Sequence, residues 1–290
     1  MYPLLVYCNG NTSSIWGIGV DTMNRLAKAK PREQLAAVLR MSGDLVRVED
    51  AARVLGISRY SAAKSLARWE SRRWLKRLKR GLYAPIPLSL TTNENVVEDP
   101  WTLVPEVFAP GYIGGATAAH HWDLTEQIFR TIFVYTTRHV RTKEETIQSF
   151  PFYIRHIPED RMFGTSTLWR GRTKILLSDV HRTVVDLFDD PSAGGGIRHV
   201  EGCLRSYLAV QDADLARVIE YAERLKNGAV FKRLGFLGER LHAPAGFVAA
   251  CAERLTKGNA KLDPTLPSPR LVKRWRLAVP DSWKDASTHD

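Results

Sequence analysis

The chain has 290 residues, a formal net charge of +11, 44% hydrophobic residues and 25% charged residues. This length is sufficient for two domains, and the composition is typical of globular proteins. No apolar run reaches the roughly eighteen residues that a transmembrane helix needs. The first eight residues lack the basic start and long apolar stretch of a signal peptide, so we expect a cytoplasmic protein.

Cysteine usage argues against a disulfide framework and a structural zinc site. The three cysteines, Cys8, Cys203 and Cys251, lie far apart, and none belongs to a C-x-x-C motif. We therefore expect Cys203 and Cys251 to be small apolar core residues.

The first elements in chain order are a tail and a short helix. Residues 1–30 include a turn-rich stretch without hydrophobic periodicity, which predicts an N-terminal tail. A first helix is predicted between Arg32 and Met41, with Pro31 near its first turn. Its expected core residues are Leu35, Ala36, Val38 and Leu39. A turn and a short strand at residues 43–46 follow.

The next segment has the pattern of a helix-turn-helix. Val48, Ala51, Ala52 and Leu55 recur at the spacing of one helical face, which predicts a helix over Val48–Leu55. The tripeptide Gly56-Ile57-Ser58 then supplies a residue tolerant of positive φ, an apolar plug and a hydroxyl that caps the next helix.

A second helix is predicted from Arg59 to Glu70. Ala62, Leu66 and Trp69 form its expected buried face. The polar side chains are expected to point outward, namely Arg59, Tyr60, Ser61, Lys64, Ser65 and Arg68. An α-helix fits the major groove of DNA, where Arg and Lys donate to guanine edges or phosphates.

A basic β-hairpin is predicted after this helix. Residues 74–78 and 82–84 read as two short strands joined through Lys79-Arg80-Gly81, which completes a winged helix-turn-helix domain over residues 31–88. The charged tip is expected to contact phosphates or a minor groove. The candidate DNA-binding residues are Arg59, Tyr60, Ser61, Lys64, Arg68, Arg72, Arg73, Lys76, Arg77, Lys79 and Arg80.

The distribution of charge favours nucleic acid over a protein-binding surface for this domain. Between Pro31 and Pro85 there are thirteen Lys and Arg against five Asp and Glu, so about a fifth of the chain carries +8 of the net charge. From Ile86 to Gly258 the counts are 20 and 21, which is nearly neutral. A positive field confined to the reading helix and the wing is typical of nucleic-acid binding.

A second domain is expected over residues 101–258, after a polar and acidic connection at Ser89–Pro100. Strand-like runs precede most of its helical patterns, so we predict an α+β domain with one mixed sheet and a helical C-terminal half. The expected strands are residues 131–136, 152–157 and 174–177. The expected helices are residues 117–122, 180–188, 197–210, 213–225, 229–241 and 245–255.

Several polar and glycine motifs in this domain have the residue types of functional sites. The stretch from Gly114 to Ala119 is a strand-to-helix junction, with Thr117 as the expected cap, and lacks a phosphate-binding glycine motif. The adjacent His120 and His121 point about 100° apart on a helix, which is a poor metal face; one is expected to be buried and the other exposed. Residues 194–196 are expected to form a flexible loop before the helix that starts at Ile197.

No motif sets out a nucleophile, a base or a metal shell, so no catalytic residue, metal or cofactor is expected. Arg182 and Asp186, four residues apart, are placed to form an intrahelical ion pair. An enzyme using His181, Asp179 or Asp186 is the weaker alternative.

The C-terminal segment, residues 259–290, is predicted to be a proline-rich basic arm. Residues 261–269 contain three prolines and are expected to be extended. Residues 270–277 alternate partly, as an edge strand does, and carry four basic residues. Two interpretations remain open, a second phosphate contact or an arm packed on its own domain by Leu271, Trp275 and Leu277. Residues 281–290 are expected to be disordered.

The order of these motifs resembles a known family. The matching segments are Tyr112–Trp122, Leu124–Gln127, Val134–Thr137, Leu177–Leu187, Gly195–Ile197 and Lys232–Leu237. Together with the winged helix they resemble the AbiEi antitoxins of type IV toxin-antitoxin (abortive-infection) systems. The tail and the C-terminal arm lie outside this resemblance.

The resemblance implies an antitoxin that binds double-stranded operator DNA, in an inverted repeat, and represses its own operon. It also implies that the second domain counteracts a nucleotidyltransferase-like toxin, directly or indirectly. As clustered polar positions, Arg182, Asp186, Lys232 and Arg233 are the first candidates in that domain, and a structural role is an equal alternative for the pair of Arg182 and Asp186. A ligand-sensing winged-helix repressor is the alternative, and a nucleic-acid-processing enzyme is a weaker one.

Overall fold

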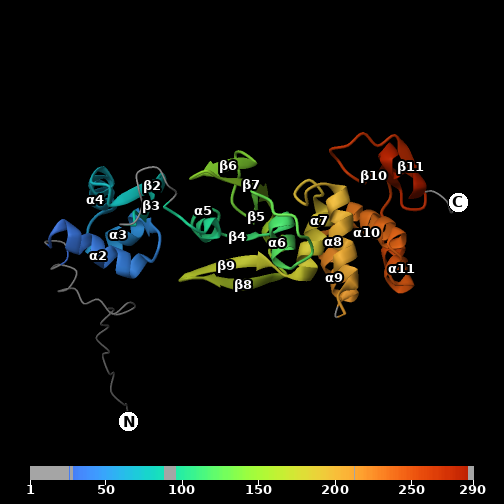
Figure 1. The fold of residues 1–290 in the computed structure, drawn as a ribbon, viewed down its shortest axis with the longest axis horizontal. Helices are drawn as coiled ribbons and strands as arrows, with labels where there is room; N and C mark the ends of the chain where they lie inside the picture. The colour runs from blue at the N-terminus through green and yellow to red at the C-terminus, as the bar shows by residue number, and fades with distance from the viewer. Residues whose placement is uncertain (1–25, 27–28, 88–95, 212, 287–290) are drawn as a thin grey trace, which may run out of the picture. The chain divides into compact units, whose positions relative to one another are not determined.

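The computed structural model describes residues 26, 29–87, 96–211 and 213–286. The chain forms two compact units, Met1–Val97 and Glu98–Asp290, each described separately below (Figure 1). Within the described residues, no helix has both the length and the apolar character needed to cross a membrane. The predicted tail lies almost entirely outside the described residues, as does most of the predicted connection between the domains.

The N-terminal unit is a winged helix-turn-helix, as the sequence predicts. Its described elements are α2 (Pro31–Ser42), β1 (Val46–Arg47), α3 (Val48–Leu55), α4 (Arg59–Ser71), β2 (Leu75–Lys79) and β3 (Leu82–Pro85). The three strands form one sheet in the order β1-β3-β2, with β3 antiparallel to both neighbours. Leu35 and Val38 of α2 are buried as expected, but Ala36 is exposed and Ala37 takes its place in the core.

The turn chemistry between α3 and α4 is the predicted one. Gly56 ends α3 in the left-handed region, with φ of 63°, where a side chain is disfavoured. The hydroxyl of Ser58 accepts a hydrogen bond from the Ser61 backbone N–H at 3.2 Å and so caps α4. The wing turns through Gly81, whose φ is +80°. Local residue chemistry therefore sets where α3 ends, where α4 begins and where the hairpin turns.

The second unit contains one mixed six-stranded sheet. The strands are β4 (Gly111–Ile113), β5 (Ile132–Thr136), β6 (Glu144–Ile147), β7 (Phe150–His156), β8 (Thr165–Arg170) and β9 (Thr173–Ser178). Their order is β6-β7-β5-β4-β9-β8. The β5–β7 and β4–β9 pairs are parallel and the others are antiparallel, which confirms the predicted mixed sheet. The three expected strands correspond to β5, β7 and β9.

Helices make up the rest of this unit, close to the predicted positions. They are α5 (Leu103–Val107), α6 (Gly115–His121), α7 (Val180–Asp189), α8 (Ile197–Ala209), α9 (Leu215–Leu225), α10 (Gly228–Arg240) and α11 (Ala245–Glu253), with 3-10 turns at Pro100–Thr102 and Glu159–Arg161. Thr117 does not cap α6, because that helix begins at Gly115. The Thr117 hydroxyl instead accepts from the Phe133 N–H and ties α6 to β5.

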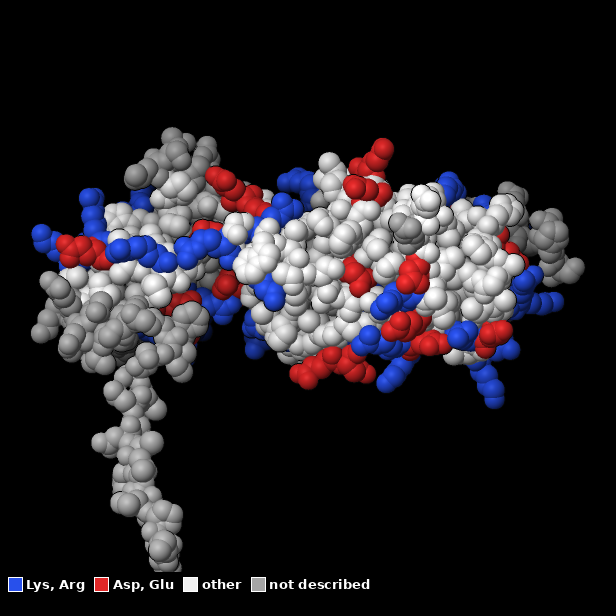
Figure 2. Space-filling view, turned by 90° about the horizontal axis from the view of Figure 1, so that it is seen from below, with Lys and Arg blue, Asp and Glu red and all other residues white. Residues whose placement is uncertain are grey.

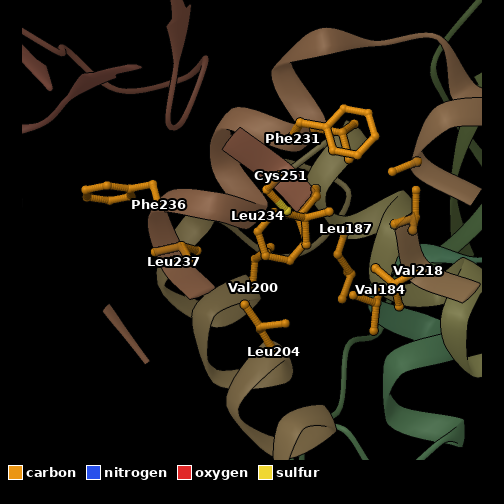
Figure 3. Close-up of a cluster of buried hydrophobic side chains, with 14 of the residues drawn as sticks. Val184, Leu187, Val200, Leu204, Val218, Phe231, Leu234, Phe236, Leu237 and Cys251 are labelled. Atoms are coloured by element: carbon orange, nitrogen blue, oxygen red, sulfur yellow. The ribbon is translucent and has the colours of Figure 1, made fainter. Parts of the chain in front are cut away.

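The main hydrophobic core lies among α7, α8, α9, α10 and α11. Figure 3 shows side chains such as Leu187, Val200 and Leu234 converging from different helices. Cys203 and Cys251 are buried in this cluster as predicted, and burial raises the pKa of each thiol to about 12. Both thiols therefore stay protonated near neutral pH and act as apolar packing groups.

The C-terminal segment packs on this core. It contains β10 (Ala260–Lys261), β11 (Arg270–Val272) and β12 (Leu277–Val279) in the order β10-β12-β11, followed by a 3-10 segment at Asp281–Ala286. Trp275 and Leu277 are fully buried, which supports the packed interpretation, whereas Leu271 is 47% exposed. The expected disorder of 281–290 is wrong for residues 281–286, because buried Trp283 anchors them; residues 287–290 lie outside the described residues.

Trp275 is the principal anchor of this segment. A Cβ placed on Gly235 of α10 would lie 1.9 Å from a ring carbon of Trp275, so the indole occupies the space that the glycine leaves. The indole N–H donates to Glu239 Oε2 at 2.7 Å. A large apolar ring and a satisfied polar atom are thus buried together.

We predict that Trp275→Ala lowers the free energy of unfolding by about 3–5 kcal/mol, because it removes a large buried ring and leaves a cavity. Leu271→Ala, at an exposed position in the same segment, serves as the control and should change it by less than about 0.5 kcal/mol. Urea denaturation followed by circular dichroism measures both. Equal losses in the two variants would contradict the anchoring role of Trp275.

Candidate nucleic-acid interface

Helix α4 is amphipathic in a way that fixes which side chains face outward. Ala62, Leu66 and Trp69 are buried as predicted and pack on the core of the N-terminal unit. The opposite face is exposed and presents Arg59, Tyr60, Ser61, Lys64 and Arg68. Tyr60 is 70% exposed, which is unusual for a large aromatic side chain and leaves it available for contact.

One residue of the expected outward face is placed differently. Ser65 was predicted to point outward but is buried, with 6% exposure. It follows Ala62 by three residues and precedes Trp69 by four, so it lies on the same helical stripe as both. Its hydroxyl accepts from Arg68 Nη2 at 3.4 Å, and through this contact it helps to orient an exposed arginine.

The exposed basic groups of α4 have weak intramolecular partners. Arg59 forms an exposed ion pair with Glu49 of α3, and the Lys64 ammonium lies 4.4 Å from the centre of the Tyr60 ring. Exposed ion pairs contribute little net stability. Both cations can therefore exchange these partners for phosphates or base edges at a small cost.

The basic surface continues from α4 into the wing. Arg72 follows α4 and its guanidinium lies 5.2 Å from the Trp74 ring, while the neighbouring Arg73 has φ of 58°. In the hairpin, Arg77, Lys79 and Arg80 are exposed and Lys76 is half-buried. The apolar positions Leu75 and Leu82 are buried beneath them. Figure 2 shows Lys and Arg side chains spread over the surface of this unit.

Most of the residues that the sequence singled out are exposed, on α4 or on the wing that follows it. A thirteen-residue helix displays cations on its free face, and a basic two-stranded ribbon directly follows it in the chain. A helix of this kind fits the major groove, and a basic ribbon fits the phosphate backbone or the minor groove. The arrangement is able to bind a nucleic-acid duplex.

The candidate residues of the second unit have a different environment. Arg182, Asp186, Lys232 and Arg233 are all buried, so a partner could reach them only after local unfolding. Lys232 Nζ donates to the Gly258 carbonyl at 2.7 Å, and Arg233 donates to the carbonyls of Phe188 and Lys261 at 2.7 and 3.0 Å. These bonds join α10 to the end of α7 and to the C-terminal segment.

Arg182 and Asp186 form the expected intrahelical pair at the centre of a larger network. Arg182 Nε donates to Asp186 Oδ1 at 2.8 Å, and the Tyr112 hydroxyl donates to Asp186 Oδ2 at 3.0 Å. Burial raises the pKa of the Tyr112 phenol well above its usual value, which keeps this donor protonated. Arg182 also donates to the carbonyls of Arg161 and Phe163 at 3.0 and 3.2 Å. The charges are therefore buried with their hydrogen bonds satisfied.

Several polar contacts of this unit carry no local sequence signal. Asp263 accepts from the Ile197 N–H at 3.1 Å and so caps α8 from sixty-six residues away. Asp189 lies beside Arg155 at 2.5 Å and accepts from Asn227 Nδ2 at 2.7 Å. In the sequence, Asp263, Asp189 and Arg155 stand out only by their charge, and their partners are too distant to be predicted from local patterns.

The glycine and histidine motifs have structural explanations. Gly115 has φ of +56°, and a Cβ there would lie 2.7 Å from the Ala193 carbonyl, so it permits close packing of α6 on the 191–196 loop. His120 is exposed and His121 half-buried, and burial lowers the pKa of His121. Among the described residues, no group of three or more His, Cys, Asp or Glu could hold a metal ion.

Comparisons with known proteins agree with this geometry. Residues 33–86 match a family described as "Transcriptional regulator, AbiEi antitoxin". The structure is similar to the crystal structure of the RV2827C protein from Mycobacterium tuberculosis, with a TM-score of 0.59 and 16% identity over 86% of this chain and 91% of that chain. At that identity the likeness shows a shared fold across both units. Among curated proteins, none matches the chain.

We predict that Arg182→Met lowers the free energy of unfolding by about 3–5 kcal/mol, because it leaves the Asp186 carboxylate buried without its charged partner. The double variant Arg182→Met with Asp186→Leu should lose less than the single variant, since both charges are then removed. Thermal and urea denaturation of the three proteins test this coupling. Strictly additive losses would show that the pair is not a coupled unit.

Proposed function

We propose that this chain, whose residues 33–86 match the AbiEi antitoxin family of transcriptional regulators, binds operator DNA through its winged helix and represses its own operon. We further propose that residues 98–290 counteract a nucleotidyltransferase-like toxin encoded alongside. The observation that carries the DNA-binding proposal is the exposed cationic face of α4, opposite the buried Ala62, Leu66 and Trp69.

The proposed binding mode places α4 in the major groove. Arg59 and Ser61 lie at the start of the helix and Lys64 one turn later, the region from which reading helices of helix-turn-helix proteins contact base edges. The wing residues Lys76, Arg77, Lys79 and Arg80 then contact phosphates, which adds affinity without sequence preference. Two copies on an inverted repeat would double this footprint.

The antitoxin part of the proposal is supported by the family match and by the separate fold of the second unit. Because Arg182, Asp186, Lys232 and Arg233 are buried, we propose that they hold the unit in shape. Contact with a toxin, where it is direct, would use other, exposed side chains. An indirect route, in which the unit opposes the effect of the toxin, is also compatible with this burial.

We predict different signatures for α4 and the wing in DNA binding. Arg59→Ala or Lys64→Ala should weaken binding to the operator by about 1–3 kcal/mol and relax its sequence preference, provided that the residue makes a bidentate base contact. Lys79→Ala with Arg80→Ala should reduce the salt slope by about two units and leave the ranking of DNA sites unchanged.

Gel-shift titrations at several salt concentrations, on DNA upstream of the chain's own gene, measure both effects. Arg40→Ala, an exposed arginine of α2, is the control and should leave affinity and preference unchanged. Wild-type behaviour in all α4 and wing variants would exclude the winged helix as the DNA-binding site.

We also predict that the two activities separate between the units. A fragment of residues 98–290 should rescue growth when co-expressed with the neighbouring toxin, and a fragment of residues 23–88 should retain weaker operator binding. The larger fragment begins at 98 because Asp99 accepts from the Trp101 N–H at 3.0 Å and lies 3.6 Å from Arg170. Rescue by the winged-helix fragment alone would mean that neutralisation works through DNA binding.

A further inference from the structure

The β8–β9 hairpin of the second unit exposes a tryptophan beside a basic turn. Trp169 is 62% exposed, although burial of an aromatic ring normally stabilises a fold. It is paired across the two strands with Lys174, so both side chains lie on one face of the hairpin. The connecting residues Gly171 and Arg172 are also exposed. The tip therefore presents one large ring between cations.

The opposite face of the same hairpin is packed within its own unit. Ile175 and Leu177 of β9 are buried. The Arg170 guanidinium lies 5.2 Å from the centre of the Trp101 ring, and its Nε lies 3.6 Å from Asp99 Oδ2. The hairpin thus has a fixed orientation, and Trp169 is held outward without contributing to that packing. An exposed ring on a rigid support is suited to binding a partner.

The positive charge of the tip favours an anionic partner. Residues 169–174 contain Arg170, Arg172 and Lys174 and no acidic residue, whereas residues 86–258 as a whole are nearly neutral, with 20 Lys and Arg against 21 Asp and Glu. Two copies of such a tip would repel each other, which disfavours self-association. A polyanion with apolar sugar edges satisfies both the cations and the ring.

The hairpin also resembles the wing of the N-terminal unit in its local design. Both are antiparallel two-stranded ribbons with basic side chains. Both turn at an Arg-Gly pair, Arg80-Gly81 and Arg170-Gly171, and the two glycines have φ of +80° and +55°. In Figure 1, β8 and β9 extend away from α8–α11 of their own unit, toward the turn at Arg170-Gly171.

We propose that the tip formed by Trp169, Arg172 and Lys174 is a second contact site for duplex DNA. Arg172 and Lys174 bind phosphates, and Trp169 packs against deoxyribose at the edge of the minor groove. This inference rests on the proposed function in one respect, namely that the natural ligand of the chain is duplex DNA. It assigns part of the DNA affinity to the second unit.

The test uses the full-length chain and a 40-base-pair duplex of arbitrary sequence, with dissociation constants measured over a series of salt concentrations. Arg172→Ala with Lys174→Ala should reduce the salt slope by about two units, because about 0.9 counterion is released per phosphate contact. Trp169→Ala should weaken binding and leave the slope unchanged, since the ring carries no charge. Arg198→Ala with Arg205→Ala, two exposed arginines of α8, is the matched control and should retain the wild-type slope.

Each outcome decides the inference. A salt slope in the hairpin double variant equal to that of the α8 control overturns it, whether or not the variant has lost toxin neutralisation. If hairpin variants lose affinity while Lys64→Ala and Arg80→Ala bind normally, the hairpin site stands and the proposed winged-helix site fails. If both sets lose affinity, both sites stand. Absence of any duplex binding by the wild-type chain overturns both.

Discussion

The larger unit depends on one buried ion pair. The Arg182 guanidinium joins α7 to β4 through Tyr112 and to the 161–163 loop through two carbonyls, and Asp186 neutralises it within the same helix. Burying these charges is costly, and the cost is offset only because each polar atom has a hydrogen-bond partner. A hydrophobic contact could hold the same elements together, but not with this directional geometry. The sheet and the helical half are therefore joined in one specified arrangement.

Three basic residues of the second unit are used differently from those of the winged helix. In the second unit Arg182, Lys232 and Arg233 are buried and donate inward to carbonyl oxygens, so their charge is used in folding. In the winged helix the corresponding side chains are exposed and bind only weakly to neighbours, as Arg59 does with Glu49. Charge that folding does not use remains available to a ligand. The number of basic residues in a domain therefore does not show which of them bind a partner. Their exposure must also be known.

Local chemistry made much of the fold predictable from the sequence. Helix α3 has the predicted bounds, Val48–Leu55, because its apolar stripe and the left-handed Gly56 are local features of the chain. Helix α4 begins at Arg59 as predicted, because Ser58 caps it. Two failures were local, since Ala36 and Ser65 were assigned to the wrong faces of their helices. Others depend on distant contacts. The roles of Lys232 and Arg233 are set by carbonyls twenty-six to forty-five residues away. Strand β8 was not predicted, because it lies at the edge of the sheet and none of its residues is buried, so its sequence lacks a clear apolar alternation.

The exposed Trp169 and the cations beside it bear on whether DNA binding is confined to the winged helix. A protein that used the winged helix only for DNA and the second unit only for a protein partner would need no cationic ribbon on the latter. The Trp101 and Asp99 contacts that orient Arg170 show that the ribbon is built into its unit. If this tip binds DNA and a toxin contacts the same hairpin, the two ligands compete for one surface, and each must weaken the binding of the other. In that case repression and neutralisation are coupled through the β8–β9 hairpin, whereas a toxin that binds elsewhere on the unit leaves them independent.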